Sequence, residues 1–176
     1  MHANMMGEVS VFGDDVAQTI LPEFRALYQY WAGVKGERWA PPWTEFHLYR
    51  VPLNMVPWCV VVDVHHDPLN FIYRFWGTQI RDLTKVELTG KSVDDIPNKS
   101  YAERARKEYS EILEYRTAMF SNMAHTDTNG MKSRYQALRV PFSSGSEVES
   151  ILSVGGYSRL PETEISNFTA QESRRW

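Results

Sequence analysis

The stretch FIYRFWGTQIRDLTKVELTGKSVDDI, Phe71–Ile96, decides the fold of this chain. It opens inside a predicted strand, Asn70–Trp76, which Gly77 closes. A short helix follows, and Ser92 with Asp95 has the spacing of a capping box for a further helical turn. Alternation predicts Phe71, Tyr73 and Phe75 on one face of the strand and Ile72, Arg74 and Trp76 on the other.

The elements on either side of this stretch predict an α+β domain. Trp58–Val64 is rich in β-branched residues and is expected to form a hairpin with Asn70–Trp76. Ser100 with Glu103 forms a second capping box, which opens a longer helix to about Arg116. Three strands follow, Thr117–Thr126, Met131–Phe142 and Val148–Ser158, with a hairpin turn at Asn129-Gly130. We therefore predict a five-stranded antiparallel sheet with short helices and one longer helix on one face, plus an N-terminal helix.

Four parts are predicted along the chain. They are a mobile N-terminal arm (1–20), an N-terminal helix with an aromatic and Pro-rich connection (21–57), the core (58–160) and a C-terminal tail (161–176). The helix starts at Pro22 and carries an apolar stripe, Phe24, Leu27, Tyr28 and Trp31. This stripe must be buried, either on the domain's own core or against a second subunit. We expect it to form the interface of a homodimer.

Composition restricts the class of protein. The 176 residues are 43% hydrophobic with a net charge of −3, which fits a soluble domain and lacks the basic patch of a nucleic-acid binder. Cys59 is the single cysteine, so an intrachain disulfide is excluded. The apolar stretch Val56–Val64 is too short to span a membrane, and the N-terminus lacks the order of a signal peptide. We expect a cytoplasmic protein with no nucleic-acid or membrane partner.

Three segments carry a resemblance to known proteins. Tyr73–Thr78 (YRFWGT) fits an aromatic-Arg-x-x-Gly-Thr motif, Leu88–Ile96 (LTGKSVDDI) fits a Leu-Thr-Gly-Arg/Lys-Ser-Leu segment, and Leu27–Trp43 fits a Tyr-x-Tyr-Trp opening. Together, over Phe24–Ser158, they resemble a family of bacterial stand-alone PAS-like proteins, and the predicted order of elements is the PAS order. The resemblance implies a PAS-like fold and a sensory role. Trp76 and Lys91 depart from the family pattern, and the Trp76 ring would fill space that a ligand needs.

Arg74 is the first candidate for a binding residue. An arginine among aromatic residues in mid-strand needs a partner. It either anchors a ligand carboxylate, because guanidinium groups bind carboxylates in a bidentate way, or forms a structural ion pair, with Asp94 or Asp95 as the expected partner. The other candidates for lining a ligand pocket between sheet and helix are Tyr73, Phe75, Tyr101, Tyr109, His125 and Tyr135.

No cofactor, metal or catalytic residue is predicted. Cys59 lies in a strand pattern without the helical context of a flavin photosensor and is expected to be a buried apolar residue. The longer helix has no histidine to bind haem. His65, His66 and Asp67 are consecutive in a turn, a spacing that seldom forms a metal site.

These observations predict a regulatory PAS-like module rather than an enzyme. It would bind a small molecule or a downstream signalling protein and act in trans, because no output domain is expected on this chain. Two alternatives stay open. One is a small α+β enzyme that uses the same pocket, with His125 near Arg74 or Tyr135 as the group to look for. The other is a structural interaction protein whose pocket is filled, which Trp76 favours.

Overall fold

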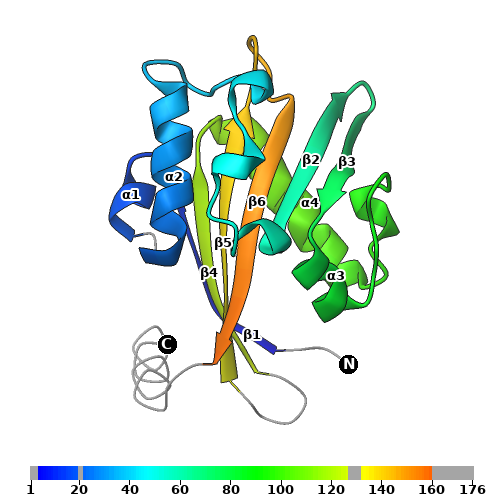
Figure 1. Ribbon diagram of the computed structural model, residues 1–176. Coiled ribbons are helices and arrows are strands. Elements are labelled where there is room, and N and C mark those ends of the chain that lie inside the picture. The colour runs from blue at the N-terminus through cyan, green and yellow to red at the C-terminus, as the bar shows by residue number, and fades with distance from the viewer. Residues whose placement is uncertain (1–3, 20–21, 127–131, 160–176) are drawn as a thin grey trace.

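The computed structural model describes residues 4–19, 22–126 and 132–159, which form a six-stranded antiparallel sheet with helices on both faces (Figure 1). The strands are β1 (Asn4–Phe12), β2 (Cys59–His66), β3 (Leu69–Trp76), β4 (Met119–Thr126), β5 (Lys132–Phe142) and β6 (Ser150–Arg159). Their order across the sheet is β1-β4-β5-β6-β2-β3. From β2 to β6 the chain runs through two strands, short helices, one longer helix and three strands. The predicted α+β class and PAS order are therefore confirmed, with six strands instead of five.

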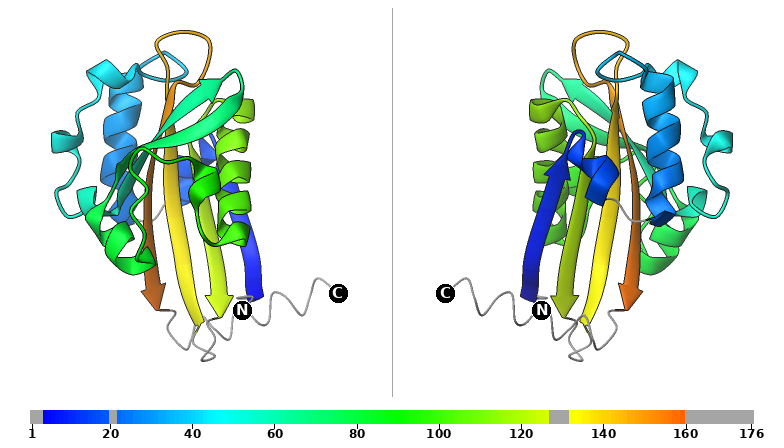
Figure 2. Two further views of the ribbon diagram at one scale, coloured as in Figure 1. Left: turned by 90° about the vertical axis from the view of Figure 1, so that its right-hand side faces the viewer. Right: turned by 90° about the vertical axis from the view of Figure 1, so that its left-hand side faces the viewer.

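Two layers of helix enclose the sheet (Figures 1 and 2). The helices are α1 (Asp15–Thr19), α2 (Pro22–Lys35), α3 (Thr78–Thr84) and α4 (Lys99–Tyr115), and the 3-10 turns are η1 (Trp43–Glu45), η2 (Leu48–Arg50), η3 (Val56–Trp58) and η4 (Val93–Asp95). We call the face that packs against α3, η4 and α4 the inner face, and the face that packs against α2 and the segment 42–58 the outer face. Each face carries its own buried apolar cluster.

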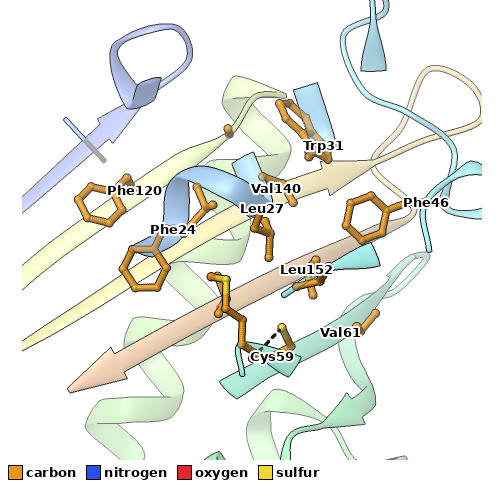
Figure 3. Close-up of a cluster of buried hydrophobic side chains, with 14 of the residues drawn as sticks. Phe24, Leu27, Trp31, Phe46, Cys59, Val61, Phe120, Val140 and Leu152 are labelled. Carbon is orange, nitrogen blue, oxygen red and sulfur yellow. Dashed lines mark hydrogen bonds between the residues drawn. The ribbon is translucent and has the colours of Figure 1, made fainter. Parts of the chain in front are cut away.

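The stripe of α2 packs on the outer face of the chain's own sheet (Figure 3). Phe24, Leu27 and Trp31 are 6%, 0% and 2% exposed. The Trp31 indole donates a hydrogen bond to the Pro141 carbonyl oxygen over 2.9 Å, and the Phe24 ring lies 5.9 Å from that of Phe120. The sequence left open whether the stripe is buried on the domain's own core or against a second subunit, and the structure shows burial on the domain's own core. These three residues of α2 are part of the monomer's core and are not free to serve as the predicted dimer interface, while Tyr28 is half-buried and packs against the same cluster.

The prediction of a mobile arm over residues 1–20 is wrong for most of these residues. Asn4–Phe12 forms β1, which pairs antiparallel with β4 at one edge of the sheet, and Asp15–Thr19 forms α1. The strand has a register shift between Met6 and Glu8. This irregularity interrupts the alternation by which sequence patterns reveal strands, since a bulged strand does not keep a period of two.

A β-bulge corrects the predicted alternation of β3. Val61 pairs with Phe75 and Val62 with Tyr73, which leaves Arg74 as an extra residue on β3. Tyr73 and Trp76 therefore both belong to the inner cluster, whereas Phe75 packs against the outer one. Directly after the strand, a Cβ at Gly77 would lie 2.3 Å from the Pro57 carbonyl oxygen, so only glycine fits this close approach of two backbones.

The start of α4 is capped by Asn98 rather than by the predicted Ser100. The Asn98 side chain accepts a hydrogen bond from the Tyr101 backbone N–H over 3.1 Å, while Ser100 lies inside the first turn. The end agrees with the prediction, because Arg116 adopts a left-handed C-cap conformation with φ 52°. The capping box at Ser92 and Asp95 is also confirmed.

We predict that Asn98→Ala lowers the free energy of unfolding by about 0.5–2 kcal/mol, because it removes the acceptor for an otherwise unpaired helical N–H. Urea unfolding followed by circular dichroism measures this change. Lys99→Ala, a substitution at the adjacent first residue of the helix, is the control and is expected to change the free energy by a few tenths of a kcal/mol. Equal losses in the two variants would show that the cap contributes nothing.

Candidate functional site

An arginine lies at the centre of the inner face. Arg139 on β5 is paired with Met119 on one side and with Ser153 on the other, and the row continues through Val60 to Trp76. Its neighbours in this row are mainly apolar, and Arg139 is only 4% exposed. A guanidinium in such surroundings requires a compensating charge.

Glu108 on α4 supplies that charge. Its Oε2 accepts a hydrogen bond from Arg139 Nη2 over 2.6 Å, and the carboxylate is 1% exposed. Ser121 on β4 joins the pair, because its hydroxyl accepts from Arg139 Nη1 over 3.3 Å and donates to Glu108 Oε1 over 3.4 Å. The buried ion pair thus ties the longer helix to two neighbouring strands of the sheet.

One polar group of Arg139 has no protein partner. Its Nε–H is buried and makes no hydrogen bond among the described residues. A buried donor without an acceptor costs roughly 1–3 kcal/mol, and such groups are rare in native proteins. The free Nε–H therefore marks the point at which a further acceptor would be stabilising.

Four tyrosines interact electrostatically with Arg139. They are Tyr73 on β3, Tyr101 and Tyr109 on α4, and Tyr135 on β5. We call these tyrosines together with Arg139, Glu108 and Ser121 the Arg139 cluster. Tyr73 and Tyr109 share a hydrogen bond, and their rings meet edge to face with centroids 6.5 Å apart. The cluster combines aromatic rings with a few polar groups, a composition that ligand sites also have.

Burial and neighbouring groups shift the pKa of three members of the cluster, Arg139, Tyr109 and Tyr73. Burial opposes the charged form of Arg139, but Glu108 and the neighbouring tyrosines outweigh it, so the pKa of the guanidinium is raised. Burial raises the pKa of Tyr109 to about 12 and also raises the pKa of Tyr73. The phenols of Tyr73 and Tyr109 therefore keep their protons at neutral pH.

A second arginine lies at the half-exposed side of the cluster. The Arg104 guanidinium is 4.8 Å from the ring centre of Tyr101 and 5.4 Å from that of Tyr135, and its Nη1 is 3.8 Å from the Met123 sulfur. The Tyr135 ring in turn lies against Gly155, where a Cβ would approach the phenol oxygen to 3.0 Å. The absence of a side chain at Gly155 therefore makes room for this ring.

The structure brings together four of the seven side chains predicted to line a pocket, namely Tyr73, Tyr101, Tyr109 and Tyr135. Phe75 packs with the outer cluster because of the bulge in β3. His125 lies on β4, opposite Ser133 in the register, but its side chain is outside the described part of the chain. Trp76 lies on the inner face, where its ring is 4.8 Å from that of Tyr73 and its Nε1 donates to the Val86 carbonyl oxygen.

Arg74 faces the outer side and forms a structural ion pair. Its guanidinium makes two hydrogen bonds to the Asp63 carboxylate and lies 5.0 Å from the centre of the Trp43 ring. The prediction that Arg74 pairs with Asp94 or Asp95 is wrong. Asp94 pairs with Arg106, and Asp95 accepts a hydrogen bond from the Ser92 N–H. Arg74 and Tyr135, the two alternative neighbours considered for His125 in an enzyme, therefore lie on opposite faces of the sheet.

We predict that Arg74→Met costs less than about 1 kcal/mol, because the Arg74 and Asp63 side chains are 40% and 31% exposed and water screens their interaction. Equilibrium unfolding in urea at low and high salt measures the loss. The same substitution at Arg81, which pairs with exposed Asp82, is the control. A loss of several kcal/mol at Arg74 alone would contradict the assignment of a solvent-screened pair.

Sequence reasoning missed Arg139 and Glu108, although both left a signal. Arg139 interrupts the apolar run of its strand as Arg74 does in β3. Glu108 falls on the buried stripe of α4, three residues after Ala105 and four before Ile112. A carboxylate on an apolar helix stripe and an arginine in an apolar strand predict a buried pair once they are considered together.

Cys59 belongs to the outer cluster (Figure 3). Its thiol is 3.4 Å from the Met55 carbonyl oxygen, and burial raises its pKa to about 12. Cys59 therefore packs as an apolar residue, as predicted. Within residues 4–19, 22–126 and 132–159, no group of three or more metal-binding side chains gathers, and no helix is long and apolar enough to cross a bilayer.

No family model matches the chain, and no curated protein matches its sequence. Among solved structures, a light-oxygen-voltage domain studied with a flavin analogue is similar with a TM-score of 0.39 and 15% identity, over 67% of this chain and 87% of that one. An RNA-binding light-oxygen-voltage receptor is similar with a TM-score of 0.48 and 8% identity, over 97% of this chain and 44% of that one. The chain thus spans less than half of that receptor. Its α+β, PAS-like class follows from its own order of strands and helices.

Proposed function

We propose that the protein is a PAS-like sensory module that binds a small molecule at the Arg139 cluster and regulates a partner in trans. The observation that carries the proposal is the buried Arg139–Glu108 pair with its unpartnered Nε–H. Buried ion pairs contribute little to net stability compared with apolar residues of the same size. A role in binding accounts for a charged group in the middle of an otherwise apolar interface.

The same pair offers a route from ligand to partner. Glu108 belongs to α4, and Arg139 belongs to β5, a strand inside the sheet. A ligand that accepts a hydrogen bond from Arg139 changes the balance of contacts between this strand and the helix. Because a ligand can shift an equilibrium only by its differential affinity for the two states, the ion pair is the element through which we expect α4 to respond.

Native mass spectrometry of the purified protein tests for a bound small molecule. Ala137→Leu is the blocking variant, since Ala137 is fully buried between Tyr135 and Arg139 on the inner face. Ala17→Leu makes the same change at an exposed position of α1 and is the matched control. We expect an added mass with the wild type and the control and none with Ala137→Leu, each folded by thermal melting.

Absence of an added mass in all three proteins, also after incubation with a cell extract, would overturn ligand binding. That result would favour the structural interaction protein, for which the Trp76 ring already fills part of the inner face. Homodimerisation stays a prediction and needs an interface other than the α2 stripe. Size exclusion with light scattering at micromolar protein tests it, and a monomer mass would exclude it.

A further inference from the structure

The charge balance of the Arg139 cluster restricts the class of ligand. Arg139 already has a carboxylate partner, Glu108, at 2.6 Å, and both groups are at least 96% buried. A second carboxylate at Arg139 would therefore be an additional buried negative charge without its own counterion. Burial of an uncompensated charge costs several kcal/mol, more than one hydrogen bond to Arg139 would return.

The remaining donor sets the second requirement. The Arg139 Nε–H is a buried donor of this cluster that has no acceptor among the described residues, so the ligand must present an acceptor atom to it. The Ser121 hydroxyl already interacts with both members of the pair. The ligand atom that faces the Arg139 Nε–H must therefore be an uncharged oxygen or nitrogen with a lone pair.

The surroundings of Arg139 set the third requirement. On the inner face the Tyr109 ring lies 5.3 Å from that of Phe71 and 6.5 Å from that of Tyr73. The Tyr101 and Tyr135 rings both lie against the Arg104 guanidinium. Aromatic walls of this kind favour a planar, polarisable body, because offset and edge-to-face contacts between rings are stabilising.

From these three requirements we infer that the site takes a small uncharged aromatic molecule with an acceptor oxygen, such as an aromatic amide, ketone or phenol, and discriminates against aromatic carboxylates. This inference rests on the proposed function and specifies the ligand class of the same site. Arg104 is partly exposed and lies against the Tyr101 and Tyr135 rings, so the discrimination against carboxylates rests on the Arg139–Glu108 pair.

Three probes of nearly the same size test the inference. Benzamide is neutral with an acceptor oxygen, benzoate has the same shape with a negative charge, and toluene has neither charge nor acceptor. Dissociation constants come from titrations of the ¹⁵N-labelled protein at neutral pH. We expect benzamide to bind at least about tenfold more tightly than benzoate and about fivefold more tightly than toluene.

The double variant Arg139→Met/Glu108→Leu keeps the volume of the pair and removes both charges, so it is expected to fold, as a melting curve verifies. In this variant we expect the preference for benzamide over toluene to disappear. Tighter binding of benzoate than of benzamide, equal binding of the three probes, or an unchanged preference in the double variant would overturn the inference. None of these outcomes decides whether the protein binds a small molecule at all, because native mass spectrometry of the purified protein tests that proposal separately.

Discussion

Replacing Glu108 with alanine is expected to lower the free energy of unfolding by about 3–5 kcal/mol, the largest loss that we predict for any single substitution in the chain. The physical reason is that Arg139, 4% exposed, would keep its charge without a counterion. The loss would exceed the value of the hydrogen bonds to Glu108, since most of it is the cost of an unpaired buried charge. Urea unfolding measured by fluorescence gives the difference.

The double variant Arg139→Met/Glu108→Leu distinguishes the contribution of the ion pair to the free energy of unfolding from the contribution of side-chain packing. Because apolar residues of similar volume replace a buried pair without loss or with a gain, we expect it to recover most of the stability lost in Glu108→Ala. Glu111→Ala removes a carboxylate that forms a more exposed pair with Lys107 and is expected to cost less than about 1 kcal/mol. A double variant as unstable as Glu108→Ala would contradict this explanation.

Leu27→Ala is expected to cost about 2–5 kcal/mol, the range for cavities left by buried leucines. The Leu27 side chain is completely buried between α2 and the outer face of the sheet (Figure 3). Since the contacts are within one chain, the loss of stability caused by Leu27→Ala should not depend on protein concentration. Measurements at 1 and 50 μM test both statements, and Leu83→Ala on the 49% exposed residue of α3 is the control.

A midpoint that rises with concentration in the wild type and not in Leu27→Ala would show that the stripe is buried by a second subunit instead. A loss below about 1 kcal/mol would show that α2 does not pack as the structure describes. Either result would reopen the dimer interface that the sequence predicted.

The order of strands and helices from β2 to β6 was predictable because its signals are local. Gly77 fits where a side chain would collide with backbone, Ser92 and Asp95 cap a turn, and the β-branched run of β2 predicts a strand. The irregular positions were not predictable. A single extra residue in β3 placed Phe75 on the opposite face from Tyr73, and the register shift in β1 concealed a sixth strand.

The candidate site was predicted in part for a related reason. Tyr73, Tyr101, Tyr109 and Tyr135 are aromatic residues on regular elements, so their shared face follows from periodicity. The polar centre depends on contact between residues 31 positions apart, Glu108 and Arg139. Each interrupts an apolar pattern of its own element, but neither local pattern identifies the other residue as its partner. Arg74 seemed the more informative arginine because it stands in a motif, although its carboxylate partner is Asp63 on the neighbouring strand.

The side-chain Nε–H resonance of Arg139 tests the central claim most directly, because this group is the proposed contact for the ligand. It can be assigned by its absence from the spectrum of Arg139→Met/Glu108→Leu. On addition of benzamide we expect the Arg139 Nε–H signal to shift in a saturable manner, while that of Arg74 on the outer face stays unchanged. A saturable shift at Arg74 with Arg139 unmoved, or no shift at Arg139 at saturating benzamide, would contradict the placement of the ligand site at the Arg139 cluster.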